Sequence, residues 1–551
     1  MPSFTLSWLD LVTVLLYVVF IVWLGLYFAR RMQTADDYFL AGRSLTWWLI
    51  GFSLFASNVS SSTLLGLASS AYGTGIAVYN YEWMATLVLI FFVLFILPFY
   101  LRTRIYTIPE FLERRFDSRA RLYFSGLLIV LNILVDTAGA LYAGALVLKI
   151  LYPEVPIWLA VGLLGFLAGL YTVAGGLKAV VYTDAVQAVL LLLGAILVAT
   201  FSFQAVGSWE VVTERVPTRD LSIILPADDP VLPWPGLVTG VFLLGFYFWC
   251  TNQFMVQRVL GARDLNHGRW GSLFAGLLKL PVLFIMVLPG IFARMLYPPE
   301  QFPMLAANTD LIYPMLLFDL LPAGIRGLVI TALVAAIMSS VDSTLNSAST
   351  LVTMDFIRRF KRQDSHTLVG AGRWVTVVFM TLAILWAPQI VRFPNLWTYL
   401  QAMLAYLSPP VVACFLMGIF WKRATRSSAF VGLLVGHLAA AVFLGLNLAD
   451  RLIVQTGPLS PEQQALVASG VPVVHFLYLP PILLVISMMA IVVASLLTPA
   501  PRPEEVEGLT WSPAFFRQES RELAALPWYQ NYRLHALGLL ALIVWILVWF
   551  R

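Results

Sequence analysis

The stretch "ASNVSSST", residues 56–63, places six hydroxyl or amide side chains inside a long apolar segment. Serine and asparagine side chains compete with helical hydrogen bonds, so the stretch predicts a break in a membrane helix. Such irregular backbone is tolerated at membrane depth where it is buried in protein or lines a wet cavity. Carbonyls freed there can ligate a small hard cation, and the N-terminus of a half-helix favours anionic or polar groups. A similar polar interruption, "GFYFWCTNQ", occurs at residues 245–253.

A second candidate for chemistry is Asp342, which lies within "AAIMSSVDSTLNSAST" at residues 335–350. It is about 24 Å of helix from both Arg326 and Arg358. Small residues near it recur at i, i+3, i+4 and i+7 and form one helical face: Ala336, Ser339, Ser340 and Ser343. An aspartate at the membrane centre costs about 2.5–3.5 kcal/mol, which favours a cation site. The alternative is that the hydroxyls bond back to helix carbonyls and ease close helix packing.

Three more charged residues fall within apolar segments: Asp184 in "GGLKAVVYTDAVQ", Lys279 in "GLLKLPVLF" and Glu82 in "YNYEWMA". Asp184 suits a functional carboxylate and an interfacial one equally well. Lys279 is near half the thickness of the membrane core, so it needs a carboxylate partner or a wet cavity. Glu82 lies among aromatic residues that could form an interfacial belt, or at a cavity mouth where it would accept hydroxyl hydrogen bonds.

The elements that must position these side chains are membrane helices. Hydrophobic residues make up 60% of the 551 residues and charged residues 11%, and mean hydropathy is +0.85. A soluble domain has about 25% charged residues. Repeated apolar runs of about 20 residues identify an all-α polytopic membrane protein. About fourteen transmembrane helices are predicted, at residues 8–30, 46–75, 79–102, 118–150, 156–174, 177–205, 236–260, 268–296, 325–357, 367–390, 395–421, 426–449, 472–498 and 533–550.

The two interrupted spans lie five helices apart, as an inverted repeat predicts. The expected organisation is a peripheral first helix and loop, a first repeat, a loop, a second repeat and peripheral C-terminal helices, at residues 1–45, 46–205, 206–235, 236–421 and 422–551 respectively.

Basic residues predict the orientation of these spans. One set of loops is rich in arginine and lysine: Arg30, Arg31, Arg43, Arg102, Arg104, Arg114, Arg115, Arg258, Arg263, Arg269, Arg358, Arg359, Lys361, Arg362, Lys422, Arg423, Arg426, Arg502, Arg517 and Arg521. The opposite loops hold only six arginines: Arg215, Arg219, Arg294, Arg326, Arg392 and Arg451. The rich side is cytoplasmic by the positive-inside rule, so both termini are expected outside.

Several function classes are disfavoured by what the sequence lacks. There is no Walker-type glycine-rich lysine motif, which argues against an ATP-driven pump within this chain. The two cysteines, Cys250 and Cys414, both lie in apolar segments and imply no disulfide framework or metal cluster. No nucleophile–base constellation is visible, so an enzyme is not expected.

In these motifs the chain resembles the sodium:solute symporter family, in its sodium/glucose-cotransporter-like branch. The motifs occur in family order across nearly the whole chain: "DYFLAGRSLTWW", "ASNVS", "YEWM", "YTIPEFLERRF", "GGLKAVVYTDAVQ", "NQFMVQR", "AAIMSSVDSTLNSAST", "TMD" and "LSPPVVACFLMGIFWKR". The resemblance implies a leucine-transporter-type fold of two inverted five-helix repeats. It also implies sodium-driven uptake by alternating access.

The resemblance further implies which residues bind sodium. The main site would use the carbonyls of Ala56, Val59 and Ala336 and the hydroxyls of Ser339 and Ser340. A second site, found in some members, would use Asp184, Ser339, Ser343 and the position of Asp342. Those members commonly have serine where this chain has Asp342. A second carboxylate could tighten sodium binding, or hold a proton if two crowded acids raise one pKa.

The polar positions of the sugar-binding branch are partly kept. The residues that would bind the solute are Asn58, Thr63, Tyr81, Glu82, Phe248, Trp249, Lys279 and Gln401. The chain departs from the branch at four of its positions. Thr63 stands where glutamine is common, Ala85 replaces a serine, Gly245 an asparagine, and Phe248 the tyrosine that stacks beneath the sugar.

The sequence therefore predicts a sodium-coupled symporter of a small polar solute, favouring a sugar or polyol. An amino acid, a carboxylate or a nucleobase is the alternative solute, and a transporter-like membrane sensor is the alternative class. The expected partners are the small solute and the lipid bilayer, with no nucleic acid and no obligate protein partner. The expected location is the plasma (inner) membrane.

Overall fold

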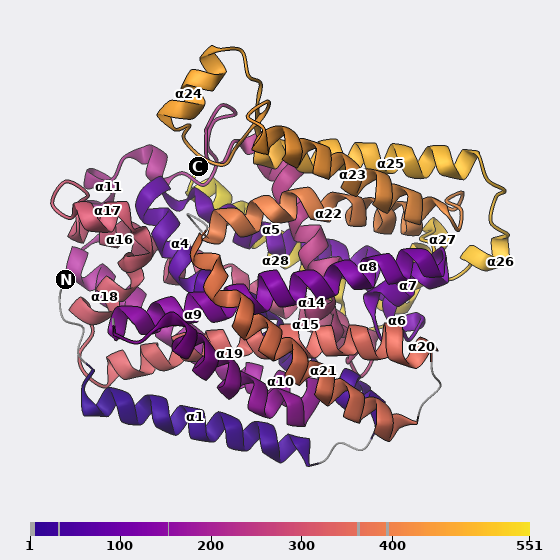
Figure 1. Cartoon of the computed structure of the whole chain (residues 1–551), viewed down its shortest axis with the longest axis horizontal. Coiled ribbons are helices and arrows are strands. Elements are labelled where there is room, and N and C mark those ends of the chain that lie inside the picture. Colours follow the sequence, from indigo (N-terminus) through magenta and orange to yellow (C-terminus); the bar gives the residue numbers. More distant parts are fainter. Residues whose placement is uncertain (1–5, 31–33, 153, 361–363, 393–395) are drawn as a thin grey trace.

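The computed structural model describes residues 6–30, 34–152, 154–360, 364–392 and 396–551 as a bundle of helices, most of which run along one direction (Figure 1). The first half of the chain forms α1 (Trp8–Ala29), α2 (Ala35–Leu40), α3 (Trp47–Asn58), α4 (Ser61–Thr74), α5 (Asn80–Phe91), α6 (Leu97–Arg102), α7 (Ile108–Arg115), α8 (Ser118–Val130), α9 (Ala138–Leu151), α10 (Ile157–Val206) and α11 (Trp209–Arg215).

The second half continues with α12 (Trp234–Gly236), α13 (Phe242–Phe246), α14 (Gln253–Leu260), α15 (Leu265–Lys279), α16 (Leu288–Leu296), α17 (Pro303–Ala307), α18 (Ile312–Leu320), α19 (Ile325–Leu351), α20 (Arg358–Phe360), α21 (Ser365–Trp386), α22 (Leu396–Phe420), α23 (Ser428–Leu448), α24 (Pro461–Ala468), α25 (Leu479–Leu496), α26 (Pro503–Val506), α27 (Pro513–Ala524) and α28 (Tyr532–Trp549). Short π-helical segments join several of these helices: Phe92–Ile96, Leu131–Thr137, Leu237–Val241, Tyr247–Thr251, Leu283–Val287 and Val352–Ile357.

The predicted number of spans agrees closely with these helices. In the described residues, twelve helices are long and apolar enough to cross a membrane, and the bent pair α3 and α4 makes a thirteenth. The shorter apolar helix Ile157–Leu170 lies where the remaining span was expected. The predicted all-α polytopic class is confirmed, with fourteen as an approximate count.

The two predicted interruptions are breaks in the helices. The α3–α4 pair bends by 57°, and Ser60 caps α4 by accepting a hydrogen bond from the Thr63 amide at 3.2 Å. Asn252 adopts an extended conformation and caps α14 by accepting from the Phe254 amide at 3.2 Å. At both breaks a polar side chain satisfies a backbone donor that the interrupted helix leaves unpaired. The polar residues of the sequence therefore account for both breaks.

Gly176 breaks a third helix, α10, between the two spans predicted at 156–174 and 177–205. Its φ of 52° is a conformation that glycine adopts freely. A Cβ at this position would lie 2.4 Å from the carbonyl oxygen of Tyr38. The chain therefore needs glycine here both for its backbone angle and for the close approach of α2.

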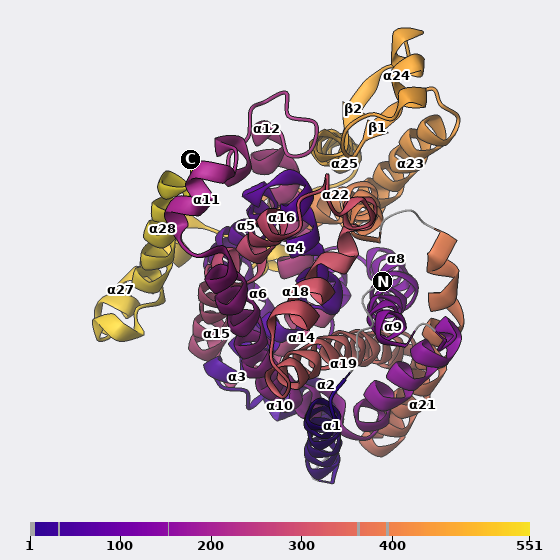
Figure 2. The ribbon, with the colours of Figure 1, turned by 90° about the vertical axis from the view of Figure 1, so that its left-hand side faces the viewer.

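One predicted helix begins later than expected. Residues Val473–His475, inside the predicted span 472–498, form strand β2, which pairs in parallel with β1 (Ile453–Gln455). Helix α25 starts only at Leu479. The strands and α24 form a small projection at one end of the bundle (Figure 2). The apolar run 471–479 resembles the start of a span, and pairing with a strand 20 residues earlier cannot be seen in it.

Helix α19, which carries Asp342, is the most enclosed span, with 89% of its apolar window buried, whereas α1 has 17%. Helices α1, α25 and α28 lie at the periphery (Figure 2). Asp10 of α1 accepts hydrogen bonds from the Gly324 and Gly327 amides at 2.8 and 2.7 Å, beside the start of α19. Because α19 is deeply buried, its polar face can contact only other parts of the protein or an internal cavity.

In the described residues, the arginine-rich loops gather at one end of the bundle, where α7, α20 and α26 lie (Figure 1). Arg31, Lys361 and Arg362 lie outside the described residues. Arg43 donates to the carbonyls of Arg104 and Ile105 at 3.0 and 3.2 Å. Arg115 donates to the Gly418, Trp421 and Ala424 carbonyls at 2.7–3.0 Å. The loops predicted to share one side of the membrane therefore contact one another.

Candidate functional site

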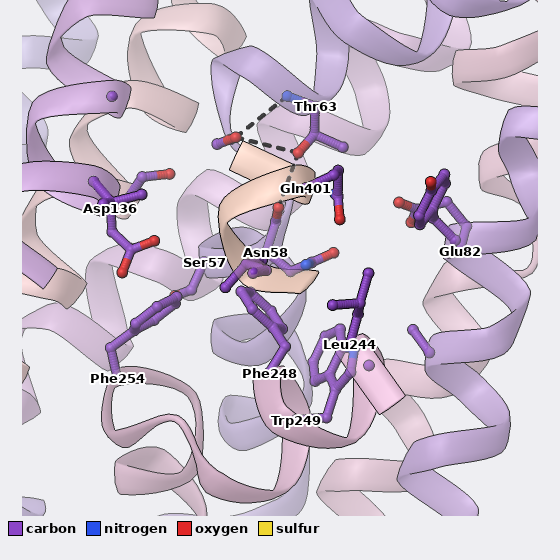
Figure 3. Close-up of a pocket in the computed structure, with 18 of the residues that line it drawn as sticks. Ser57, Asn58, Thr63, Glu82, Asp136, Leu244, Phe248, Trp249, Phe254 and Gln401 are labelled. Carbon is purple, nitrogen blue, oxygen red and sulfur yellow. Dashed lines mark hydrogen bonds between the residues drawn. The ribbon is translucent and has the colours of Figure 1, made fainter. Parts of the chain in front are cut away.

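A cavity of about 180 Å³ lies beside the break between α3 and α4 (Figure 3). The break, α5, α22 and the π-helical segments Leu131–Thr137 and Tyr247–Thr251 all contribute side chains to its wall. π-Helical turns are often found at functional sites because they re-aim side chains within a helix. Seven of the eight residues predicted to bind the solute line this cavity: Asn58, Thr63, Tyr81, Glu82, Phe248, Trp249 and Gln401.

The break positions two of these residues directly. Asn58 is the last residue of α3. Thr63 lies in the first turn of α4, and its Oγ1 donates to the Asn58 carbonyl at 3.1 Å. This hydrogen bond joins the two half-helices and holds both residues at the cavity wall.

The eighth residue, Lys279, lies behind the cavity wall and pairs with two residues in it. Its Nζ is 2.5 Å from Glu82 Oε2, and both side chains are buried. The same Nζ donates to Asn58 Oδ1. The ammonium group therefore meets the requirement for a carboxylate partner that its membrane depth predicted. It also fixes the carboxylate of Glu82 and the amide of Asn58, which leaves the Asn58 NH₂ group available to the cavity.

Aromatic side chains close one side of the cavity. The rings of Phe248 and Trp249 meet edge to face with centroids 5.4 Å apart, and Phe248 meets Phe254 in the same way at 5.4 Å. Figure 3 shows these rings below Asn58. Faces and edges of this kind cover the apolar surface of a ligand without making hydrogen bonds to it.

Asp136 also lines the cavity, and it was missed by the sequence analysis. It belongs to the π-helical segment Leu131–Thr137 and lies on the opposite side of the cavity from Glu82 (Figure 3). Among the described residues its carboxylate has no hydrogen-bond or ion-pair partner. The signal was present in "LNILVDTAGA", where a single aspartate lies within a mostly apolar span, but this stretch belongs to none of the motifs above.

The carbonyls of Ala56 and Val59 are released at the break. In an unbroken helix they would accept from the amides of Ser60 and Thr63. The Ser60 amide instead donates to Asn58 at 3.0 Å, and the Thr63 amide donates to the Ser60 carbonyl at 3.1 Å. Both carbonyls therefore lose the helical partner that would have satisfied them. Free carbonyl oxygens of this kind are suitable ligands for a hard cation such as sodium.

The predicted partners on α19 are all buried. The Ser340 hydroxyl lines the cavity and donates to the Ala336 carbonyl at 3.0 Å. The Ser339 hydroxyl donates to Asp184 Oδ1 at 2.6 Å, and Ser343 donates to the Ser339 carbonyl at 2.5 Å. The hydroxyls of Ser340 and Ser343 thus donate to helix carbonyls four residues earlier, as the alternative interpretation of these serines predicts. A hydroxyl that donates in this way still has lone pairs with which to accept or ligate.

The region of the predicted second cation site contains a guanidinium group. Arg258 Nη2 lies 3.2 Å from Asp184 Oδ2, and its side chain is 1% exposed. It also donates to Ser53 at 2.6 Å, to Ser57 at 2.5 Å and to Ser343. Ser343 Oγ also lies 3.1 Å from Asp342 Oδ1. All four residues predicted for this site therefore contact Arg258 or each other.

Arg258 was wrongly assigned to the arginine-rich loops. It lies on α14, directly after the second break, and is one of the largest fully buried side chains. The short polar face of "NQFMVQR" resembles the end of a span, which is why the sequence placed this arginine at the surface. The signal that could have found it is the presence of two buried carboxylates, which require a positive charge nearby.

Comparisons with known proteins agree with the family that the motifs indicate. The chain matches the model of the sodium:solute symporter family over residues 38–436. It is 37% identical to the rabbit (Oryctolagus cuniculus) sodium/myo-inositol cotransporter 2 over 91% of this chain and 78% of that protein. It is 36% identical to the zebrafish (Danio rerio) sodium/glucose cotransporter 4 over 96% of this chain and 84% of that protein.

Two solved structures share the fold. A sodium-coupled sialic acid symporter in a substrate-bound outward-open state matches with a TM-score of 0.76 at 24% identity, over 90% of this chain and 99% of that one. Mhp1, a nucleobase-cation-symport-1 family transporter in a closed conformation, matches with a TM-score of 0.55 at 14% identity, over 85% and 97%. The predicted leucine-transporter-type fold is confirmed. By its sequence the chain belongs to the sodium:solute symporter family.

Proposed function

We propose that this protein imports a neutral sugar or polyol together with sodium, by alternating access. The observation that carries the proposal is the break at Val59 and Ser60. It releases carbonyls for a cation on one side and places Asn58 and Thr63 at the cavity on the other. The names of the rabbit and zebrafish relatives, which specify myo-inositol and glucose, support this solute class.

The charges around the cavity favour a neutral solute with several hydroxyl groups. Glu82 and Lys279 neutralise each other, so the pair can accept and orient hydrogen bonds without attracting a net charge. Asp136 adds an unpaired carboxylate on the opposite side (Figure 3). A carboxylate solute would be repelled by Asp136, whereas hydroxyl groups can donate to both Glu82 and Asp136. A polyol with donors at opposite ends therefore suits this cavity better than an anionic solute.

Sodium couples to the solute through the shared break. Sodium bound by the Ala56, Val59 and Ala336 carbonyls and the Ser339 and Ser340 hydroxyls fixes the ends of α3 and α4. The same residues then hold Asn58 and Thr63 in place for the solute, so each ligand reduces the cost of ordering the site for the other. Each sodium ion that enters gains about 2.3 kcal/mol per 100 mV of membrane potential.

Arg258 bears on how many sodium ions are carried. Its guanidinium group already supplies a positive charge to Asp184 and Ser343. We propose that this fixed charge takes the place of a second cation, so that one sodium ion accompanies each solute. A flux ratio of two sodium ions per solute would contradict this.

The protein is a multi-pass membrane protein, and we propose that it resides in the plasma (inner) membrane with its arginine-rich end in the cytoplasm. Both chain termini would then be outside, since Asp10 and Phe550 contact loops at the opposite end. An epitope at the C-terminus should be accessible to antibody on intact cells. If the epitope were labelled only after permeabilisation, the true orientation would be the opposite of the one proposed.

Uptake into proteoliposomes tests the proposed function. Labelled myo-inositol and glucose should enter in a sodium gradient and not in an equal potassium gradient. Ser340→Ala should remove most sodium-driven uptake, because the hydroxyl lies at both the cavity and the carbonyl of Ala336. Ser487→Ala is the matched control, since Ser487 makes the same back-bond, at 2.7 Å, on the peripheral α25. Equal uptake in sodium and potassium would contradict the proposal.

A further inference from the structure

A second cavity, of about 290 Å³, lies at the arginine-rich end of the bundle and takes no part in the site described above. It is formed by the loop before α7, by α7 and α8, and by the end of the long helix that begins with α19. Its volume is several times the ~30 Å³ that one water molecule occupies in the liquid. Its wall contains five arginines and one carboxylate: Arg104, Arg114, Arg121, Arg358, Arg359 and Glu110, with Tyr106 and Met354.

Three carboxylates at this cavity are already paired with arginines. Glu110 pairs with Arg114 at 2.7 Å. Asp355 pairs with Arg121 at 2.6 Å and also accepts from Thr107 and Ser125 at 2.6 and 2.5 Å. Glu113 pairs with both Arg121 and Arg359 at 2.5 Å. Partial burial would raise the pKa of Glu113, but the two guanidinium groups lower it below its ordinary value, so it is fully charged at neutral pH.

Arg104 and Arg358 are left without a carboxylate partner among the described residues. Arg358 stacks on the Tyr106 ring at 4.9 Å, and Arg43 stacks on the same ring at 5.6 Å. Burial and a hydrogen bond with Asp36 raise the pKa of Tyr106 to about 12, so this phenol stays neutral and supplies no negative charge. Among the described residues the five arginines of the wall face four carboxylates, Glu110, Glu113, Asp355 and Asp36, so the cavity keeps an excess of positive charge.

Two of these arginines are held in position, Arg121 by its guanidinium group and Arg104 by its backbone. Arg121 is 11% exposed and is fixed by Asp355 and Glu113. Arg104 has a φ of 48°, which is uncommon for a residue other than glycine, and its carbonyl accepts from Arg43 at 3.0 Å. The positive-inside rule explains why arginines occur at this end, but not why they surround a cavity from three separate segments.

We propose that this cavity binds a phosphate-type oxyanion, either the headgroup of an anionic phospholipid or free phosphate. Guanidinium groups match the geometry of phosphate oxygens with paired N–H donors. Basic pockets between helices on the cytoplasmic side are known to bind lipid headgroups. An anion held by Arg104 and Arg358 would join the loop before α7 to the helix that carries Ser339 and Ser340. The proposal does not depend on which solute is transported.

The test is thermal stability of the purified full-length protein with two probes, inorganic phosphate in detergent and vesicles of phosphatidylcholine with or without phosphatidylglycerol. Arg104→Gln and Arg358→Gln remove the two unpaired charges without breaking an ion pair, so both variants should fold. Arg102→Gln is the matched control, because Arg102 lies at the same end and stacks on Phe515 at 4.3 Å, outside the cavity. Each cavity variant should weaken binding by roughly tenfold, as expected for loss of a charge-assisted hydrogen bond.

The two probes distinguish the two sources of the anion. If inorganic phosphate raises the melting temperature of the wild type and of Arg102→Gln, and the cavity variants respond less, the site takes free phosphate. If only phosphatidylglycerol has this effect, the ligand is a lipid headgroup. If neither probe stabilises the wild type, or if the cavity variants respond as the control does, the proposal is wrong.

Discussion

Two buried pairs of a carboxylate and a cation lie at membrane depth, and their surroundings differ. The Glu82–Lys279 pair borders a cavity, so the carboxylate can exchange hydrogen bonds with a solute. The Asp184–Arg258 pair is enclosed by serine hydroxyls that use most of its hydrogen-bonding capacity. A charged residue at membrane depth is therefore not by itself a ligand site. The presence of an adjacent cavity separates a pair that can bind solute from a pair that holds helices together.

The largest effect is expected from breaking the enclosed pair. Arg258→Met should lower the free energy of unfolding by about 3–5 kcal/mol, because Asp184 would remain buried without a counter-charge. Denaturant or thermal unfolding of the purified protein measures this. Asp184→Asn combined with Arg258→Met should recover much of the loss, since no charge is then left unpaired. An unfolding free energy unchanged in the single variant would show that the pair is not structural.

Breaking the pair beside the cavity should affect binding more than stability. Glu82→Gln should raise KM for the solute about 10–100-fold, as expected for one or two hydrogen bonds to a charged group. Its loss of stability should be smaller than that of Arg258→Met, because the glutamine oxygen and Asn58 Oδ1 can still accept hydrogen bonds from Lys279. Uptake kinetics and unfolding of the same preparation measure both effects. Glu110→Gln serves as the control, because it removes an ion pair at the arginine-rich end, outside the solute cavity. An unchanged KM with a large loss of stability would erase the distinction between the two pairs.

In the part of the chain that the structure describes, Asp136 offers a carboxylate at the cavity without a paired cation. Asp136→Asn should raise KM about tenfold, which corresponds to one charge-assisted hydrogen bond. The protein should become more stable, because a charged aspartate at membrane depth costs about 2.5–3.5 kcal/mol. Uptake kinetics and unfolding of the same variant should therefore show weaker solute binding together with higher stability. A variant that is both less stable and unchanged in KM would mean that Asp136 serves the fold and not the solute.

The smallest effect is expected from an exposed pair with the same chemistry. Arg426 and Glu505 lie 2.8 Å apart, with side chains 70% and 32% exposed. Glu505→Gln should change the free energy of unfolding by less than about 1 kcal/mol, and added salt should remove the difference. A loss as large as that of Arg258→Met would show that burial does not control the strength of these pairs.

The sequence predicted the features that depend on local composition. The polar residues at 56–63 and 245–253 predicted both helix breaks, and the depth of Lys279 predicted its need for a carboxylate. The spans followed from apolar length, because a membrane helix must satisfy its own backbone. The sodium and solute assignments of individual residues remain predictions, although the structure brings most of them to one cavity.

Features that depend on contacts between distant segments could not be predicted. Arg258 looks like a loop residue until α3, α10 and α19 are packed around it. Asp136 belongs to none of the sequence motifs, and only the fold brings it across from Glu82. Strand β2 is a three-residue segment, Val473–His475, whose partner lies 20 residues earlier.

The central claim is that sodium and solute share the break at Val59 and Ser60. Solute affinity measured at equilibrium over a range of sodium concentrations, at constant ionic strength with potassium, tests it most directly. The account predicts that Kd for the polyol falls as sodium rises, that the solute raises sodium affinity by the same factor, and that Ser340→Ala removes this dependence while Ser487→Ala does not. A Kd that is the same in sodium and potassium would contradict the account.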